Sequence, residues 1–219
     1  MAVPIRGNLP RFVFLPPNGW EIVQSVGLQT LDLAILVRVQ VSQPNFARMT
    51  ADSPNEAAMM VIVMGTTGSG KTTIGTLLAK RLVWEFADAD DFHPPANVEK
   101  MGHGIPLTDA DRMPWLKILH DKIVGWNAEQ RNFVLACSAL KQSYRNELRA
   151  GPEVKFVYLK GSYELFSRRV LARKGHFAKQ NLITSQFADL EEPIDAITID
   201  ARHSPAEIVE EARKQIGFA

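Results

Sequence analysis

The 219-residue sequence predicts an α/β domain of three layers, in which helices cover both faces of a five-stranded parallel sheet. From residue 60 onward, short apolar runs alternate with amphipathic stretches, as in a chain of βα units. A glycine-rich turn follows the first apolar run and precedes a helical pattern. Apolar residues make up 46% of the chain and charged residues 22%, which excludes a wholly disordered chain and a multispan membrane protein.

The alternating pattern places each element in turn. We expect strands at residues 60–64, 84–87, 133–137, 155–159 and 196–199. Helices are expected at residues 71–82, 110–126, 141–149, 163–173 and 205–216. The last helix has the clearest start, because Ser204 is a good N-cap, Pro205 suits the first turn and Glu207 completes a capping box.

Residues 1–58 lack this pattern and contain scattered prolines, so we expect an N-terminal extension followed by one domain at 59–219. The extension is interpreted as disordered, or as lying upstream of the true start at Met49, Met59 or Met60. An organelle-targeting segment is the less favoured alternative. The longest uncharged apolar run in this extension, residues 33–37, is far shorter than the roughly 20 residues that a membrane-spanning helix needs.

Charge and cysteine content restrict the partners and the compartment. The chain has 25 basic and 24 acidic residues, and a net charge of +1 gives no general reason to expect a nucleic-acid or membrane partner. A secretory signal is not recognisable. The single cysteine, Cys137, fits a reducing compartment, so we expect a cytoplasmic protein.

The glycine-rich turn at residues 65–72 matches the phosphate-binding pattern G-x-x-x-x-G-K-[ST]. Its backbone amides and the following helix N-terminus suit phosphate oxygens, Lys71 reaches the β- and γ-phosphates, and Thr72 offers a hydroxyl to Mg²⁺. The pattern therefore predicts a bound nucleoside triphosphate. The residues expected to bind it are Gly65, Thr66, Thr67, Gly68, Ser69, Gly70, Lys71, Thr72 and Thr73.

Carboxylates for the metal and for the acceptor are expected after the second strand. No Asp ends the apolar run at 133–137, where a phosphate-loop protein usually holds Mg²⁺, so Asp88 and Asp90 are the candidates. Their spacing of two places both on one side of an extended segment. They belong to a segment, 85–111, with seven acidic residues and one lysine, a net charge of −6.

A second segment, 155–179, has seven basic residues and one glutamate, a net charge of +6. Within it Arg169 and Arg173 are four residues apart on one helical face, so both can address one ligand. They precede Lys174-Gly175-His176, whose glycine suits the hinge of a closing lid. We expect these arginines to neutralise charge on the transferred phosphoryl group. A solvated helix face is the alternative.

Several motifs together resemble the gluconokinase family, whose members phosphorylate D-gluconate at its 6-hydroxyl with ATP. The segments that make the resemblance specific are His-Pro-Pro-Ala-Asn-Val-Glu-Lys-Met at 93–101 and Cys-Ser-Ala-Leu-Lys at 137–141. The resemblance covers about residues 60–217 and implies a fold similar to adenylate and shikimate kinases. It also implies a helical substrate-binding insert, a lid, ATP and Mg²⁺ as cofactors, and a homodimer.

The resemblance also implies roles for individual residues. Asp88 holds the Mg²⁺ shell, and Asp90 accepts a hydrogen bond from the 6-hydroxyl or deprotonates it. The segment 93–115 lies over the sugar acid, where the planar guanidinium of Arg112 suits its carboxylate. The remaining expected contacts are Lys141 and Arg145 as a second cationic pair, and His93, which either touches the substrate or supports the turn at Pro94.

Other functions remain open at this point. One is a sibling kinase acting on another hydroxylated acid, such as a shikimate-like acceptor. A nucleotide-dependent switch is less favoured, because the chain has neither a metal-binding Asp on the later strand nor an Asn-Lys-x-Asp guanine motif. A nucleic-acid-dependent ATPase would need a basic stripe interleaved with aromatic residues, which no segment outside the expected lid supplies.

Overall fold

The computed structural model describes residues 58–151, 153–172 and 177–218. The expected extension at 1–58 falls almost wholly outside these ranges, and so do Arg173 and the expected hinge at 174–176. Predictions about those residues therefore stay predictions.

The sheet has five parallel strands, as the sequence predicts, and their order is β2-β3-β1-β4-β5. The strands are β1 (Met60–Met64), β2 (Glu85–Asp88), β3 (Phe133–Ala136), β4 (Val154–Lys160) and β5 (Ile197–Asp200). In the central strand Ile62 is in register with Leu135 of β3 and Phe156 of β4. The strand order changes direction at β1, and ligands of open α/β sheets bind at the carboxyl end of such a strand.

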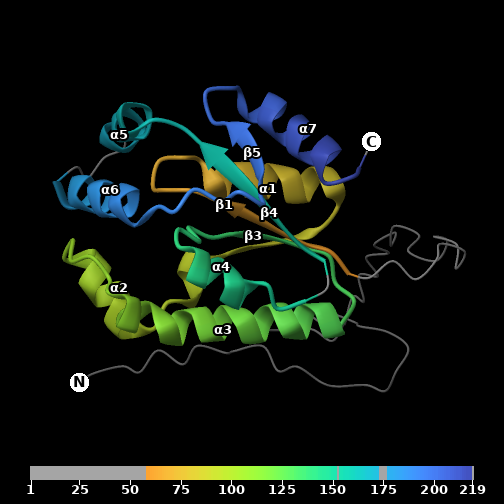
Figure 1. The fold of residues 1–219 in the computed structure, drawn as a ribbon, viewed down its shortest axis with the longest axis horizontal. Coiled ribbons are helices and arrows are strands. Elements are labelled where there is room, and N and C mark those ends of the chain that lie inside the picture. The colour runs from red at the N-terminus through yellow and green to blue at the C-terminus, as the bar shows by residue number, and fades with distance from the viewer. Residues whose placement is uncertain (1–57, 152, 173–176, 219) are drawn as a thin grey trace, which may run out of the picture. The chain divides into compact units, whose positions relative to one another are not determined.

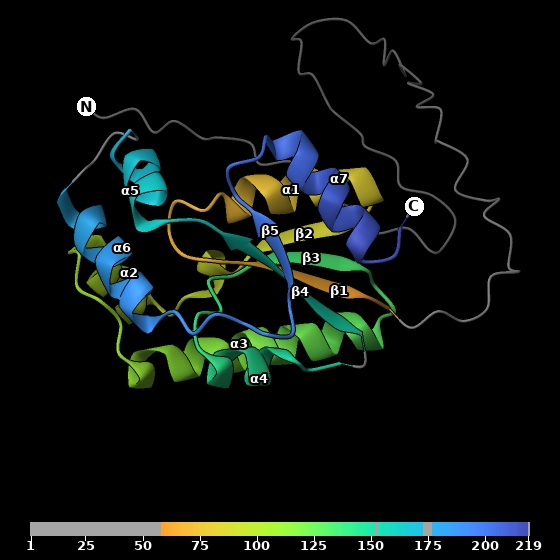
Figure 2. The ribbon, with the colours of Figure 1, turned by 45° about the horizontal axis from the view of Figure 1, so that its top comes forward.

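Helices cover both faces of the sheet and form the expected three layers (Figure 1). The helices are α1 (Lys71–Leu82), α2 (Pro95–Gly102), α3 (Asp109–Ala128), α4 (Gln142–Leu148), α5 (Tyr163–Leu171), α6 (Phe177–Asp189) and α7 (Pro205–Gln215), with a 3₁₀ turn η1 (Ala89–Phe92). Figure 2 shows α3 and α4 under one face and α1 and α7 over the other, with α2, α5 and α6 gathered where the strands end. The helix α2 is the expected insert, whereas η1 and α6 were not anticipated as separate elements.

The core consists of two apolar layers separated by the sheet. Ile62 packs with Leu119 on the α3 side, and Val63 packs with Leu78 on the α1 side. All five residues of β1 are at most 4% exposed. This explains the unbroken apolar run at 60–64, because a central parallel strand is buried on both faces.

Capping boxes fix the starts of two helices. At α7 the expected box is confirmed, since the Ser204 amide donates to Glu207 Oε2 at 2.8 Å and the Glu207 amide donates to Ser204 Oγ at 3.4 Å. A second box begins α3, where the Thr108 amide donates to Asp111 Oδ2 at 2.9 Å and the Asp111 amide donates to Thr108 Oγ1 at 3.2 Å. Because α3 begins at Asp109, its first turn carries polar side chains to the carboxyl end of the sheet.

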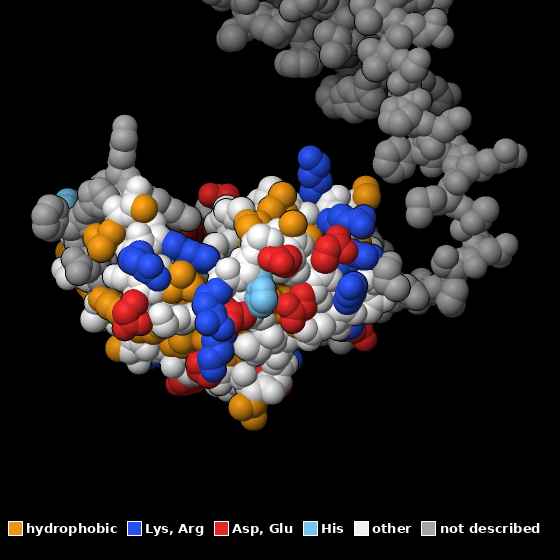
Figure 3. Space-filling view, turned by 90° about the horizontal axis from the view of Figure 1, so that it is seen from above, with side chains coloured by type: hydrophobic (Ala, Val, Ile, Leu, Met, Phe, Trp, Pro, Cys, Tyr) orange, Lys and Arg blue, Asp and Glu red, His pale blue; other side chains and the backbone are white. Residues whose placement is uncertain are grey.

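On the face drawn in Figure 3, basic and acidic side chains lie among one another. Lys155 Nζ donates to the Ile216 carbonyl at 2.9 Å, and Lys160 Nζ donates to Glu192 Oε2 at 2.7 Å. These two of the seven basic residues in segment 155–179 therefore have partners within the fold. Among the described residues, no helix has the length and apolar character that crossing a membrane requires.

Candidate active site

The turn at residues 65–72 lies between β1 and α1, at the carboxyl end of the central strand. Gly65, Gly68 and Gly70 have φ values of 144°, 85° and 100°, which favour glycine. A Cβ on Gly68 would lie 2.7 Å from the Phe166 carbonyl oxygen and 2.9 Å from Val170 Cγ2. The turn therefore needs glycine at position 68 both for its backbone conformation and for its close approach to α5.

The inside of this turn has polar groups that suit phosphate oxygens. Lys71 Nζ donates to the Thr66 carbonyl at 3.1 Å, which folds the lysine back over the turn. Thr66 and Ser69 are each 1% exposed, and their hydroxyls have no hydrogen-bond partner among the described residues. A buried unsatisfied hydroxyl costs about 1–3 kcal/mol. Two such hydroxyls beside a glycine-rich turn fit a phosphate ligand that would satisfy them.

A residue that the sequence did not reveal also contacts this turn. Gln186 on α6 accepts a hydrogen bond from the Thr67 amide, at 2.6 Å to its Oε1. The contact fixes the tip of the turn to a helix 119 residues further along the chain. Neither periodicity nor a motif marked Gln186.

Asp88 and Thr72, the two residues expected to hold Mg²⁺, lie in direct contact. The Thr72 hydroxyl donates to Asp88 Oδ2 at 2.7 Å, and Asp88 Oδ1 accepts from the Asp90 amide at 3.1 Å, which caps η1. A hydroxyl and a carboxylate at the foot of the phosphate turn are hard oxygen ligands of the kind that Mg²⁺ prefers. These two residues would hold the ion.

Asp90 lies two residues further, in η1, with 80% of its side-chain surface accessible. Its pKa is nevertheless raised above the ordinary value, first because the surrounding protein displaces water from the carboxylate and second because Asp88 is negatively charged. A higher pKa makes this carboxylate a stronger hydrogen-bond acceptor and base.

His93 is held against the neighbouring helix. Its ring stacks on Trp115, with ring centroids 4.4 Å apart and planes at 10°. Only 5% of its side chain is exposed, and its Nε2 lies 4.0 Å from Asp90 Oδ1. Burial, and next the charge of Arg112, lower the pKa of His93 to about 4, so the imidazole is neutral at pH 7.

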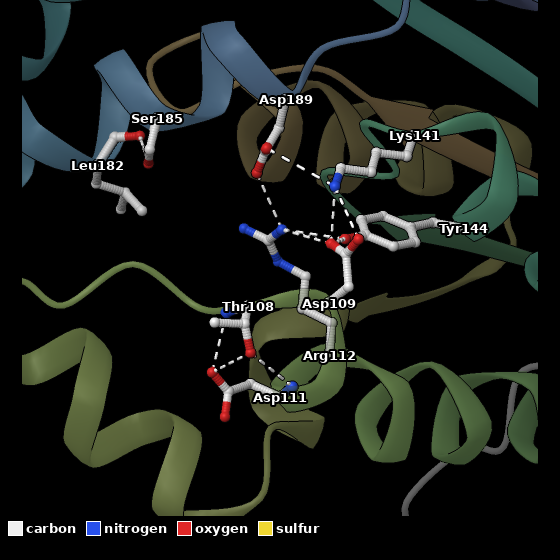
Figure 4. A network of polar contacts seen from close by, with 9 residues as sticks. All are labelled: Thr108, Asp109, Asp111, Arg112, Lys141, Tyr144, Leu182, Ser185 and Asp189. Carbon is white, nitrogen blue, oxygen red and sulfur yellow. Dashed lines mark hydrogen bonds and ion pairs between the residues drawn. The ribbon is translucent and has the colours of Figure 1, made fainter.

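The expected basic residues Arg112 and Lys141 meet in a polar network that joins α3, α4 and α6 (Figure 4). Arg112 Nη1 donates to Asp189 Oδ2 at 3.0 Å and to the Tyr144 hydroxyl at 3.1 Å. Lys141 Nζ donates to Asp109 Oδ1 at 2.8 Å, and the Tyr144 hydroxyl donates to the same carboxylate. Both cations thus have carboxylate partners from within the chain.

Arg145 does not join this network. It is 1% exposed and donates to the carbonyl oxygens of Ala139 and Leu140 at 3.0 and 2.9 Å. Lys141, its expected partner four residues earlier, is the extended N-cap of α4, with φ −94° and ψ 150°, so the two side chains do not share a helical face. Arg145 therefore holds the loop after β3. This position does not favour the expected contact of Arg145 with the substrate, which stays a prediction.

Arg169 is beside the phosphate turn but contacts backbone. Its Nη2 donates to the Ala201 carbonyl at 2.7 Å and its Nη1 to the Ser69 carbonyl at 3.5 Å. It therefore ties α5 to the turn and to the loop before α7. A contact with the transferred phosphoryl group stays a prediction for Arg169, and for Arg173, which lies outside the described residues.

Comparison with known proteins agrees with this geometry. Residues 67–217 match the shikimate kinase family model. A probable gluconokinase of Xenopus tropicalis is 48% identical over 62% of this chain and 80% of the relative, and the thermosensitive gluconokinase of Escherichia coli K12 is 42% identical over 71% and 86%. A crystal structure of a gluconokinase from Sinorhizobium meliloti has a TM-score of 0.66 at 38% identity and covers 73% of this chain and 92% of that one.

The range that matches the family model, residues 67–217, contains Lys71, Thr72, Asp88, Asp90 and the network of Arg112 and Lys141. The fold is that of the phosphate-loop kinases. On the identity and coverage of these relatives, the chain belongs to the gluconokinase family, within the kinases that match the shikimate kinase model.

Proposed function

We propose that this protein transfers the γ-phosphoryl group of ATP to the 6-hydroxyl of D-gluconate. The observation that carries the proposal is the junction of the phosphate turn with the acidic segment, where Thr72 binds Asp88 directly and Asp90 follows on the open side. The relatives named gluconokinases, at 42–48% identity, support the acceptor.

Positioning and charge neutralisation are the main tasks of the chain in such a transfer. The amides of the turn, the hydroxyls of Thr66 and Ser69 and the ammonium of Lys71 would bind the phosphates. When bound by Thr72 and Asp88, Mg²⁺ would neutralise phosphate charge.

Asp90 would orient the acceptor alcohol. A carboxylate with a raised pKa, next to the phosphate turn and open to solvent, can accept the hydroxyl proton as the new O–P bond forms. Arg112 and Lys141 would receive the carboxylate of gluconate. The hydrogen bonds of Arg112 to described residues all use Nη1, which leaves the other guanidinium nitrogens for an added acceptor.

An acceptor panel tests the proposal. ADP release would be followed with ATP and Mg²⁺ in the presence of D-gluconate, shikimate, D-glucose or no acceptor. We expect strong stimulation of ADP release by D-gluconate and little by the others. D-glucose lacks the carboxylate, and the hydroxyls of shikimate lie on a ring, at a different distance from its carboxylate. Stimulation by shikimate alone would replace the proposed acceptor with the alternative kinase.

Three further features belong to the same proposal. The protein would use Mg²⁺ as its metal, would act in the cytoplasm, and would form a homodimer, as the family resemblance implies. Omission of Mg²⁺ from the assay, cell fractionation and light scattering test these points separately.

A further inference from the structure

We infer that His93 is a positioning residue for Asp90, whose carboxylate it holds through Nε2–H in the orientation that receives the acceptor hydroxyl. The inference rests on the proposed function, since Asp90 has this task only in transfer to an alcohol. It concerns a contact within the chain, so it can be tested without substrate.

The ring of His93 has a fixed position. It stacks on Trp115 at 4.4 Å, and the Trp115 indole is itself anchored because its Nε1 donates to the Ala89 carbonyl at 2.8 Å. Ala89 is the first residue of η1, the turn that carries Asp90. The histidine, the tryptophan and the turn therefore form one packed unit, in which the ring cannot rotate freely.

The hydrogen bonds of Asn97 assign the tautomer. Its Nδ2 donates to the Asp111 carbonyl at 2.8 Å, and this hydrogen bond identifies the atom as the amide nitrogen. The same Nδ2 lies 3.4 Å from His93 Nδ1. An amide nitrogen donates hydrogen bonds and does not accept them. His93 Nδ1 must therefore accept, and the proton of the neutral ring resides on Nε2.

That proton faces Asp90, whose Oδ1 is 4.0 Å from Nε2. The distance is longer than a hydrogen bond, but the Asp90 side chain is 80% exposed and can rotate toward the fixed ring. Other charges nearby are Asp88, Asp91 and Lys71 around Asp90, and Arg112 beside His93. A donor at one carboxylate oxygen leaves the second oxygen for the acceptor hydroxyl.

Nuclear magnetic resonance of ¹⁵N-histidine-labelled protein tests the contact directly. We expect the Nε2-protonated tautomer for His93, and a shift of its Nε2–H resonance in Asp90→Asn but not in Asp91→Asn, which removes the same charge one residue away. An Nδ1-protonated ring, or equal responses to the two variants, would overturn the inference.

Kinetics test the consequence. His93→Phe keeps an aromatic ring on Trp115 but lacks the donor, so we expect kcat with gluconate to fall roughly 10- to 100-fold with an unchanged KM for ATP. His93→Gln supplies an amide N–H and should recover most of this loss. The matched control is His120→Phe, since His120 contacts the Glu147 carbonyl between α3 and α4. We expect it to match the wild type.

The kinetic outcomes separate the two proposals. A wild-type rate in His93→Phe, or no recovery in His93→Gln, would contradict the positioning role while leaving the gluconokinase activity intact. A wild-type protein that does not use gluconate would contradict the proposed function, and the resonance test of His93 would still decide whether the contact exists.

Discussion

Acidification should destabilise this protein in part through His93. In the folded state its pKa is lowered to about 4 from 6.5, mainly by burial. Between these values the unfolded chain binds a proton that the folded protein does not, so stability rises with pH. The stabilisation is fully present above pH 6.5 and is lost as the pH falls toward 4. At about 1.4 kcal/mol per pKa unit, the full contribution is about 3 kcal/mol, of which about 2 kcal/mol is lost by pH 5.

Urea unfolding at pH 7.5 and pH 5.0 measures this contribution. We expect the free energy of unfolding of the wild type to fall by about 2 kcal/mol more between the two values than that of His93→Phe, which keeps the ring stack without a titrating group. Other titrating groups are common to both proteins, and His120→Phe should behave as the wild type does. Equal pH dependence in wild type and His93→Phe would show that burial does not keep this imidazole neutral.

Three substitutions test the phosphate turn, the acceptor carboxylate and the loop after β3. Lys71→Ala should lower kcat/KM by on the order of 100- to 1000-fold with an unchanged thermal midpoint, and a variant that fails to fold would indicate a structural lysine instead. Asp90→Asn should still bind a fluorescent ATP analogue while turnover falls roughly 100- to 10,000-fold, and near-normal turnover would remove Asp90 from the base role. Arg145→Met should lose about 2–4 kcal/mol in urea unfolding, because two loop carbonyls lose their donors; a loss confined to gluconate affinity would restore the substrate contact.

The sheet and the helices that cover it could be predicted because each buries an apolar face. The run at 60–64 and the capping box at Ser204 are local signals, and the structure confirms both. The helix α2 illustrates what the pattern cannot show. Only Asn97 of its eight residues is buried, so no apolar stripe marks the helical period.

The site was predictable where a motif has a local geometry. The phosphate turn and the Asp88–Asp90 spacing depend on a few adjacent residues, and the structure brings Thr72 and Asp88 into contact. Asp189 and Gln186 were missed because their partners are 77 and 119 residues away, and only the fold brings α6 to them.

Arg145 shows where the spacing of two residues along the sequence does not define their surroundings. The sequence shows the spacing from Lys141 but not that the helix begins one residue later. Its buried guanidinium, directed at backbone carbonyls, became apparent only in the structure.

In the proposed reaction η1, which carries Asp90, presents the 6-hydroxyl of gluconate to the γ-phosphate that the phosphate turn binds at Lys71. Phosphorus NMR of the product formed from ATP and D-gluconate tests it most directly. We expect a single new phosphomonoester on the C6 oxygen, formed roughly 100- to 10,000-fold more slowly by Asp90→Asn. Phosphorus appearing only as inorganic phosphate, or on another hydroxyl, would contradict it.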